Sequence, residues 1–425
     1  MSASVAAKGL ARDQDAAIAP AVETPSTRRE LRVLQVFSVL SVGGAETWLM
    51  ALLKYFNESA HGLPVKVKCD ILLTGGEPSV FDEEAKALGA RLFYVLFTRK
   101  NPLRFVTEFR RILAAGQYDV VHDHQDYIAG LHFLMGLGHL PPIRIAHVHN
   151  HFYERAKYAK GLVRRVVRPA GHHLLGRLAT HVMGTSRQVV SEYGFDGFKS
   201  RGVALGAAYC GFDVSSYQGN REQIHTDLCR EFGWEPSAKV ILFVGRLEAD
   251  AVFPLGPITS DKNPGFALEV AKECLRRDSE VRLLMVGAGN KKRRELESQI
   301  REWGLEERIK LAGIRTDVPR LMLGSNLLLF PSLAEGLGMV VVEAQAAGLP
   351  VLASDATPRE CVVVPELVEF LPLTDPNNWA RQTLQLLSRP RPNPSECNAA
   401  VRRSPFSIEN SAMSLAAIYC ERENA

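Results

Sequence analysis

One stretch, Phe330–Asp355, constrains the fold of this chain most. It reads FPSLAEGLGMVVVEAQAAGLPVLASD, which is an apolar run, a glycine-bearing loop, a helical pattern and a second apolar run. An apolar run that stops at a proline is typical of a buried parallel strand, and the Gly and Pro after the helical pattern are stop signals. The stretch therefore predicts strands at Leu327–Phe330 and Val351–Ala353, joined by a helix that begins near Gly338.

Two carboxylates bracket the start of this helix. Glu335 lies in the loop and Glu343 in the helix, with seven residues between them. A helix N-terminus offers N–H groups and partial positive charge to a phosphate, and Gly336 and Gly338 allow close approach to the backbone. The spacing fits a phosphorylated ligand with a hydroxyl-rich group on each side. An ordinary strand–helix crossover with two solvated glutamates fits it equally well.

Similar apolar runs alternate with helical patterns along the rest of the chain. The further strands are expected at Leu31–Phe37, Val65–Leu73, Arg91–Leu96, Asp119–His124, Arg144–His149, His181–Gly184, Lys239–Gly245, Val281–Gly287, Arg308–Gly313 and Leu367–Leu371. Alternating strands and helices predict an α/β protein with doubly wound parallel sheets, in which ligands bind beyond the carboxyl ends of the strands.

The length of 425 residues predicts two such domains, each with a core of its own. A turn-rich, polar segment after Tyr209 marks the boundary. The expected parts are a disordered tail (residues 1–28), an N-terminal domain (29–213), a C-terminal domain (214–405) and a last helix that could pack on either domain (406–425).

Composition excludes several classes of protein. The formal net charge is only +4 and no arginine-rich tract is present, so we expect no nucleic-acid partner. Seven cysteines without a Cys-x-x-Cys pair indicate reduced thiols in the cytoplasm. No apolar run is long enough for a transmembrane helix, and the tail lacks the apolar centre of a signal peptide.

A basic stretch, Arg155–Arg177, contains seven Lys or Arg and no acidic residue. Apolar residues are interleaved with these cations. Such a pattern could rest on an anionic membrane surface, and it fits a solvated helix face at least as well.

The first strand is followed by a glycine pair, Gly43 and Gly44, and then by a helix. A dinucleotide-binding protein would carry Gly-x-Gly-x-x-Gly here, so the pair disfavours a nicotinamide oxidoreductase. The two glycines either let a sugar or phosphate approach or form a plain tight turn.

Histidines cluster at the ends of two expected strands. They are His122 and His124 in VVHDHQD and His147, His149 and His151 in RIAHVHNHF. Residues at i and i+2 share one face of a strand, so a metal site is conceivable. No Cys, Asp or Glu framework accompanies them at helical spacing, and we expect hydrogen-bonded histidines without a metal.

Several motifs now carry a family resemblance. EGLGMVVVEAQAAGLPVLASD resembles the signature of retaining GT-B glycosyltransferases of the glycogen synthase and sucrose synthase superfamily, closest to bacterial members that build exopolysaccharide. VGGAE, VVHDH, HVHN, GFD, VGRL, KNP and DVPRLM follow in the order of that family. The resemblance extends over nearly the whole chain from Leu31. It implies that the N-terminal domain (29–213) is the acceptor side and that the C-terminal domain (214–405) binds the nucleotide-sugar.

The resemblance implies a role for each carboxylate and for two cations. Glu335 would face the donor sugar and Glu343 the ribose of the nucleotide. Arg246 and Lys262 would neutralise the departing diphosphate, which makes a divalent metal unnecessary. Fifteen residues separate these two cations, many more than is usual in the family, so the insertion must loop out and return Lys262 to the site.

The remaining site residues follow from the same resemblance. Backbone amides of Gly338 and Met339 would hold the diphosphate, and Gly43 and Gly44 would lie near the donor phosphate and the acceptor. His124 matches the histidine of the family near the donor sugar. A second candidate is His149.

The expected function is retaining transfer of a sugar from a nucleoside diphosphate, UDP or GDP, to a glycan or lipid-linked saccharide in cell-surface polysaccharide biosynthesis. No cofactor is expected, and the enzyme would lie in the cytoplasm or at the inner face of the membrane. The alternatives are another GT-B chemistry, such as nucleotide-sugar epimerisation or phosphorylation of soluble acceptors, and a catalytically silent binding or scaffold subunit.

Overall fold

The structure is a computed structural model that describes residues 29–58, 62–98, 100–151, 163–247, 252–253, 256–257, 262–289 and 291–421. The expected N-terminal tail lies outside the described residues. Most of the insertion between Arg246 and Lys262 and the first part of the basic stretch also lie outside them.

The N-terminal domain is built on a seven-stranded sheet in the order β3-β2-β1-β4-β5-β6-β7, with every neighbouring pair parallel. The strands are β1 (Glu30–Phe37), β2 (Lys66–Leu73), β3 (Leu92–Tyr94), β4 (Val120–Asp123), β5 (Ile143–Val148), β6 (His181–Gly184) and β7 (Ala204–Ala207). The helices are α1 (Gly44–Glu58), α2 (Asp82–Ala87), α3 (Pro102–Gly116), α4 (Ile128–Met135), α6 (Arg168–Leu178) and α7 (Arg187–Glu192).

The C-terminal domain repeats the plan with a six-stranded parallel sheet in the order β12-β11-β8-β13-β14-β15. Its strands are β8 (Lys239–Val244), β11 (Val281–Val286), β12 (Ile309–Gly313), β13 (Leu327–Phe330), β14 (Val351–Ser354) and β15 (Val368–Leu371). Its helices are α8 (Arg221–Phe232), α9 (Pro264–Arg277), α10 (Lys291–Glu302), α11 (Val318–Gly324), α12 (Met339–Ala346), α13 (Pro376–Leu387) and α14 (Pro394–Arg403).

Helices cover both faces of each sheet, as strands with apolar side chains on both faces require. In β1, Val33 and Phe37 pack in one core cluster with α1. Leu34 and Val36 pack in another with α3. The predicted fold class, two doubly wound parallel sheets, is confirmed.

Strand order reverses once in each sheet, between β1 and β4 in the first and between β8 and β13 in the second. The loops that follow these strands diverge there and leave room for a ligand, so such a point is the usual ligand site of an open α/β sheet.

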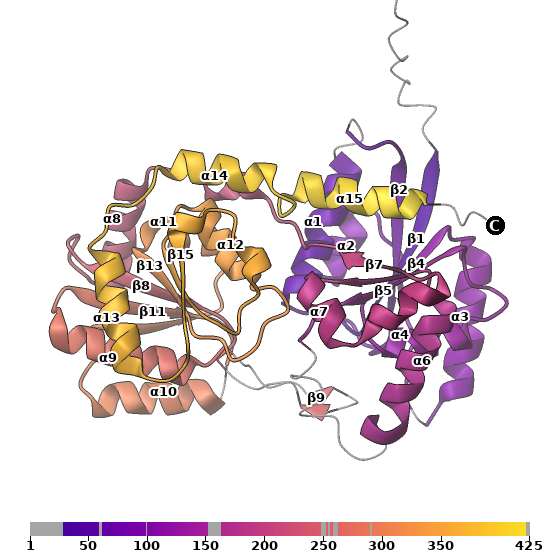
Figure 1. Ribbon diagram of the computed structural model, residues 1–425, viewed down its shortest axis with the longest axis horizontal. Coiled ribbons are helices and arrows are strands. Elements are labelled where there is room, and N and C mark those ends of the chain that lie inside the picture. The colour runs from indigo at the N-terminus through magenta and orange to yellow at the C-terminus, as the bar shows by residue number, and fades with distance from the viewer. Residues whose placement is uncertain are drawn as a thin grey trace, which may run out of the picture.

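The last helix, α15 (Ile408–Cys420), crosses back from the C-terminal domain to the N-terminal one, where it lies beside α1 (Figure 1). Trp48 of α1 donates to Ser411 Oγ over 3.0 Å. Where the chain enters α15, it lies beside the segment around Phe212 that first connects the two domains. Phe212 N donates to the Phe406 carbonyl over 3.1 Å, and Ile408 N donates to the Phe212 carbonyl over 3.0 Å.

Two parts of the fold differ from expectation. Strand β7 was not predicted, because ALGA is short and only partly buried and gives no apolar run. The insertion after Arg246, expected to be a loop without elements, contains the two-residue strands β9 (Val252–Phe253) and β10 (Gly256–Pro257), paired antiparallel.

Candidate active site

Loops at the carboxyl ends of the two sheets meet at Gly336. This residue follows β13, and a Cβ atom built on it would lie 2.4 Å from the main-chain oxygen of His149, which follows β5. Ser186 Oγ, after β6, donates to the Gly336 carbonyl over 2.6 Å. The loop that carries Glu335 is therefore held directly against the N-terminal domain.

Glu335 and Lys262 form an ion pair in this loop region. The Glu335 side chain is 8% exposed and that of Lys262 26% exposed. Gly245, at the end of β8, makes room for the lysine, because a Cβ there would lie 2.9 Å from Lys262 Cγ. The Lys262 ammonium also lies 5.1 Å from the centroid of the Phe330 ring. Despite the insertion, the chain thus returns Lys262 to the switch point of the second sheet.

Helix α12 begins at Met339, as the loop glycines suggested. Gly338 precedes it with a φ of 88°, a left-handed conformation that favours glycine. A Cβ on Gly338 would also lie 2.9 Å from Thr357 Cγ2. Met339 packs against core clusters of both domains, so the N-terminus of α12 points toward their junction.

Glu343 lies one turn further along α12, beside Tyr217, the last residue of the 3-10 helix η3 (Val214–Tyr217). Burial raises the pKa of Glu343 to about 7, although the Tyr217 hydroxyl, which donates to the carboxylate, and the Lys262 charge both lower it. The charge of Glu343 therefore changes near neutral pH. Lys262 acts electrostatically on this glutamate while it is paired with Glu335.

Glu46 and Arg246 interact electrostatically across the domain junction. Burial raises the pKa of Glu46 to about 7, against a backbone hydrogen bond and the Arg246 charge, which lower it. Gly43 is needed for this arrangement, because a Cβ there would lie 2.3 Å from Glu46 Oε2. Gly44, the first residue of α1, is exposed and has open space around it.

Four histidines lie side by side at the switch point of the first sheet. His124 Nδ1 and His149 Nε2 are 2.8 Å apart, and His122 Nε2 and His147 Nδ1 are 3.3 Å apart. Burial lowers the pKa of His122 and His124 well below its usual value and that of His147 to about 3, so these rings are neutral. Trp48 packs against all four.

Three of these histidines form a cluster that could hold a metal. One ring nitrogen from each lies within 4.8 Å of those of the other two, in His122, His124 and His147. Both ring nitrogens of His122 and of His124 make hydrogen bonds within the protein. A metal ion would have to replace those bonds.

Four residues of this region were not predicted. Gln35 had a visible signal, because it is the one polar side chain within the apolar run VLQVF. Glu46 stands two residues after the glycine pair. Tyr217 and Tyr419 lie in segments that carry no motif, and only the tertiary structure brings them to the site.

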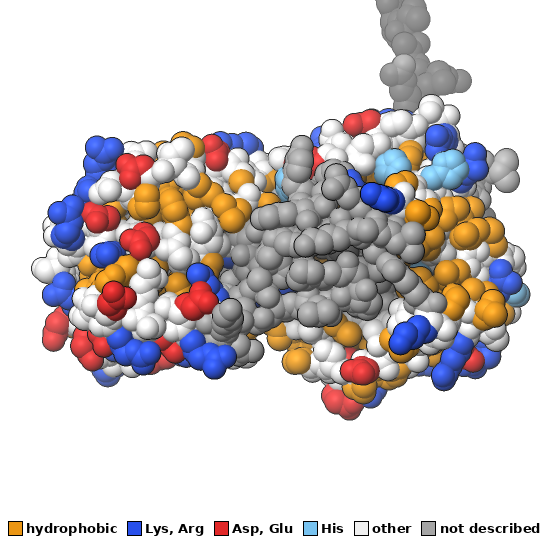
Figure 2. Space-filling model, turned by 90° about the horizontal axis from the view of Figure 1, so that it is seen from below, with side chains coloured by type: hydrophobic (Ala, Val, Ile, Leu, Met, Phe, Trp, Pro, Cys, Tyr) orange, Lys and Arg blue, Asp and Glu red, His pale blue; other side chains and the backbone are white. Residues whose placement is uncertain are grey.

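The basic stretch is described only from Val163 onward. Its visible part forms a π-helical turn, η1 (Val163–Val167), and α6, which packs on α4 with Gly171 against Gly130. Figure 2 shows hydrophobic side chains gathered on the N-terminal domain. In the described part of the chain no helix is long and apolar enough to cross a membrane.

Comparison with protein families gives two matches that together span most of the chain. Residues 43–205 match the family described as "Glycosyl transferase 4-like domain". Residues 238–389 match the family described as "Glycosyl transferases group 1".

Curated proteins and solved structures agree with these matches. The chain is 28% identical over 364 residues to the "Putative glycosyltransferase EpsF" of Bacillus subtilis, covering 85% of this chain and 89% of EpsF. It is 30% identical over 124 residues to the UDP-Gal:alpha-D-GlcNAc-diphosphoundecaprenol alpha-1,3-galactosyltransferase of Escherichia coli, covering 28% and 31% of the two chains. Anabaena HepE, solved with UDP-glucose, shares the fold with a TM-score of 0.64 at 19% identity, covering 91% of this chain and 94% of HepE. The chain therefore belongs to the GT-B glycosyltransferases, with a glycosyl transferase 4-like domain followed by a group 1 domain.

Proposed function

We propose that this glycosyltransferase moves a sugar from UDP or GDP to a glycan or lipid-linked saccharide in cell-surface polysaccharide biosynthesis, with retention of configuration and without a metal. The names of the similar proteins support the substrate classes. One is a transferase from UDP-Gal to a diphosphoundecaprenol-linked sugar, and another was solved with UDP-glucose.

The observation that carries the proposal is the Lys262–Glu335 pair beside the start of α12. A diphosphate bound between the amides of Gly338 and Met339 and the Lys262 ammonium would place its sugar next to Glu335. Arg246 supplies a second cation from the loop after β8. Fixed positive groups stabilise the charge that builds on the departing diphosphate, which is the work a divalent metal would otherwise do.

Retention follows from front-face substitution. The acceptor hydroxyl forms the new bond to C1 on the side from which the diphosphate leaves. Its proton passes to the phosphate oxygen released from C1, so neither a protein nucleophile nor a protein base is needed. The buried neutral histidines suit this scheme, because a ring with so low a pKa is a poor base.

The other ligand contacts are assigned to groups that the fold places at the junction. Glu343 would accept from the ribose hydroxyls, and Gly44 leaves open space for the acceptor. His124 is hydrogen-bonded within the protein through both ring nitrogens, so His149, which is partly exposed, is the ring that would meet the sugar.

We further propose that the enzyme works in the cytoplasm, at the inner face of the membrane. Exposed hydrophobic side chains on the N-terminal domain, including Leu103, Leu134 and Val166, together with the cations of Arg155–Arg177 support this location. Sedimentation with anionic vesicles at low salt should carry the protein down, and protein left in the supernatant would contradict the location.

A panel of nucleotides and nucleotide-sugars tests the donor. UDP or GDP should raise the Tm in the presence of EDTA, because binding to the folded state alone stabilises it. The matching nucleotide-sugar should be slowly hydrolysed without an acceptor. If no nucleoside diphosphate changes the Tm, the assignment fails.

Glu335→Ala tests the site itself. Loss of a charged hydrogen bond to the sugar should lower kcat by about 100-fold while the Tm shift by UDP or GDP persists. Glu307→Gln, at a carboxylate 92% exposed on the surface, is the control and should behave as wild type. Equal loss of nucleotide binding and transfer in Glu335→Ala would contradict a sugar-facing role.

A further inference from the structure

Helix α7 is held at its start by two segments of the other domain. Ser186, the N-cap residue of the helix, donates to the Gly336 carbonyl over 2.6 Å. Glu360 accepts from the next two N–H groups, those of Arg187 and Gln188, over 3.0 and 3.1 Å. In Figure 1, α7 lies on the side of the N-terminal domain that faces the C-terminal domain. The start of this short helix is therefore a contact point between the domains.

The chemistry of this contact requires a carboxylate. Three donors meet Glu360, because the Tyr209 hydroxyl adds a bond of 2.8 Å to those from the two N–H groups. The first N–H groups of a helix have no partner within it and carry the positive end of its dipole. Both oxygens of an ionised carboxylate accept hydrogen bonds, whereas the nitrogen of an amide in the same place would face at least one donor with a donor.

Gln345 of α12 fixes the backbone that follows Glu360. Its fully buried side chain donates from Nε2 to a carbonyl of α12 itself and, over 2.8 Å, to that of Cys361. Its Oε1 accepts from the N–H groups of Val363 and Val364, over 2.7 and 2.8 Å. Both donors and both lone pairs of this amide are used, and three of the four bonds hold the chain directly after Glu360.

Residues 357–364, the tie segment, also pack on the start of α12. A Cβ built on Gly338 would lie 2.9 Å from Cγ2 of Thr357. The tie segment is thus held near both ends of α12 and carries Glu360 between these two attachments. The loop before α12 supplies the Gly336 contact and the tie segment after it supplies the Glu360 contact. The two contacts with α7 therefore flank α12 in the chain.

We propose that Glu360 is a positioning residue of the sugar transfer and that Gln345 sets its place. Together they hold α7 and α12 in a fixed relative position, so that Glu335, directly before Gly336, stays against the N-terminal domain during transfer. This rests on the proposed function, in which the acceptor is bound by that domain. The rate of a reaction between two bound groups depends steeply on their geometry, and a displacement of about 1 Å can lower it by about 100-fold.

Hydrogen exchange in the full chain tests the contact without any assay of activity. Glu360→Ala should raise the exchange rates of the Arg187 and Gln188 amides at least about 10-fold, because both lose a charged acceptor. Glu360→Gln should give an intermediate result, with one of the two amides still protected, because one accepting oxygen remains. Helix α3 of the same domain is the internal reference, and its exchange rates should stay those of wild type.

Gln345→Leu separates positioning from direct contact. The four bonds of Gln345 are all made within the C-terminal domain, so faster exchange at α7, with α3 unchanged, would be transmitted through the tie segment. We expect such a rise, smaller than that in Glu360→Ala. The double variant should exchange no faster at α7 than Glu360→Ala alone, because both changes act on one contact. Should Gln345→Leu not fold, Glu360→Ala decides.

Glu366→Ala is the matched control. It removes an exposed carboxylate six residues further along the chain, just beyond the tie segment. Exchange at α7 should be that of wild type in this variant. Wild-type exchange of both amides in Glu360→Ala, or an equal rise in Glu366→Ala, would overturn the proposal.

Kinetics connect the contact to transfer. Glu360→Ala should lower kcat about 10-fold, while KM for the nucleotide-sugar changes less than about 2-fold and UDP or GDP still raises the Tm. A wild-type kcat in Glu360→Ala, with both amides exposed, would overturn the positioning role. If no nucleoside diphosphate changes the Tm of wild type while exchange at α7 responds as expected, the sugar-transfer assignment falls and the assignment of the interdomain contact stands.

Discussion

Glu343 and Glu46 have carboxyls whose pKa is raised by burial to about 7. Each is also subject to the field of a cation, Lys262 for Glu343 and Arg246 for Glu46. Burial raises the pKa of each carboxyl, a hydrogen bond and the cation lower it, and the balance places both titrations near neutral pH. A ligand that donates hydroxyls to Glu343 would favour its charged form and lower the pKa again.

Glu343→Gln should therefore change how stability depends on pH. The folded pKa of Glu343, about 7, is above its value of 4.5 in an unfolded chain, so its protonated form favours folding. This contribution is full below pH 4.5 and is lost as the pH rises through 7. The variant, which cannot ionise, should be more stable than wild type by less than about 1 kcal/mol at pH 5 and by about 3 kcal/mol at pH 8.

Thermal unfolding of both proteins from pH 5 to pH 8, without nucleotide, measures this difference. Glu307→Gln, at the exposed surface, controls for removal of a negative charge as such. If the Tm of wild type and that of Glu343→Gln change in parallel with pH, burial does not shift the pKa of this carboxyl.

Some site residues could be predicted from the sequence and others could not, for physical reasons. Glu335, Glu343 and Gly338 stand in one local segment whose strand–loop–helix pattern fixes their order. Lys262 was predicted from KNP alone, and only the packed structure shows that it reaches Glu335. Tyr419 carries no local signal, because its partner Gln35 is brought to it by tertiary folding.

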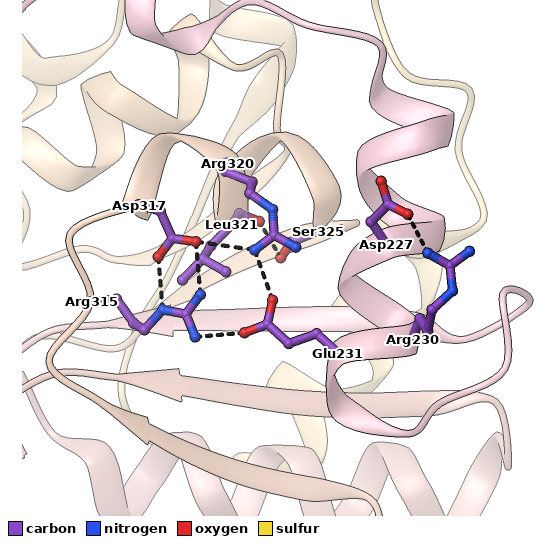
Figure 3. A network of polar contacts seen from close by, with 8 residues as sticks. All are labelled: Asp227, Arg230, Glu231, Arg315, Asp317, Arg320, Leu321 and Ser325. Atoms are coloured by element: carbon purple, nitrogen blue, oxygen red, sulfur yellow. Dashed lines mark hydrogen bonds and ion pairs between the residues drawn. The ribbon is translucent and has the colours of Figure 1, made fainter.

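At the scale of elements, ion pairs tie the loop between β12 and α11 to α8. Arg315 pairs with both Asp317 and Glu231, and Arg320 with the same two carboxylates (Figure 3). The side chains are between 24% and 34% exposed, so solvent screens them only in part. The network holds in place the carboxyl end of β12, which is the edge strand of the sheet and pairs with β11.

Glu231→Gln should lower the free energy of unfolding of the C-terminal domain by about 1 kcal/mol, because it breaks two ion pairs of a network. Urea unfolding measures the change, and 1 M salt should reduce it by screening. Asp227→Asn, on the same helix, removes the exposed ion pair with Arg230 and weakens the contacts with Gln223, and it is the control (Figure 3). An equal effect of both variants, unchanged by salt, would contradict a network contribution.

Elements were predictable where burial imposes a pattern. Strands β8 and β13 are nearly or completely buried on both faces, so each reads as an unbroken apolar run. Strand β7 has partly exposed small residues, and its place at the sheet edge comes from pairing with β6. The paired β9 and β10 lie in the insertion between Arg246 and Lys262, which was expected only to loop out.

At the scale of the molecule, three sets of contacts stand out among the described residues that join the domains, in addition to the electrostatic interaction of Glu46 with Arg246. Besides the Gly336 contact, Glu360 of the C-terminal domain accepts from the N–H groups of Arg187 and Gln188 at the start of α7, over 3.0 and 3.1 Å. The Tyr209 hydroxyl also donates to Glu360, over 2.8 Å. The third set is the crossing of the chain into α15. No repeat or periodicity in the sequence encodes these contacts, so the mutual placement of the domains could not be predicted.

Gly336→Ala should open this junction. The new Cβ would lie 2.4 Å from the His149 main-chain oxygen and 2.8 Å from Thr185 Oγ1, and a rigid strand end cannot yield as a flexible side chain would. The domains should separate, which small-angle scattering would detect as a larger radius of gyration, and kcat should fall about 10- to 100-fold because Glu335 no longer meets the N-terminal domain. Gly265→Ala in α9, where a Cβ meets only open space, is the control. If Gly336→Ala keeps the radius of gyration and the kcat of wild type, catalysis does not need this contact.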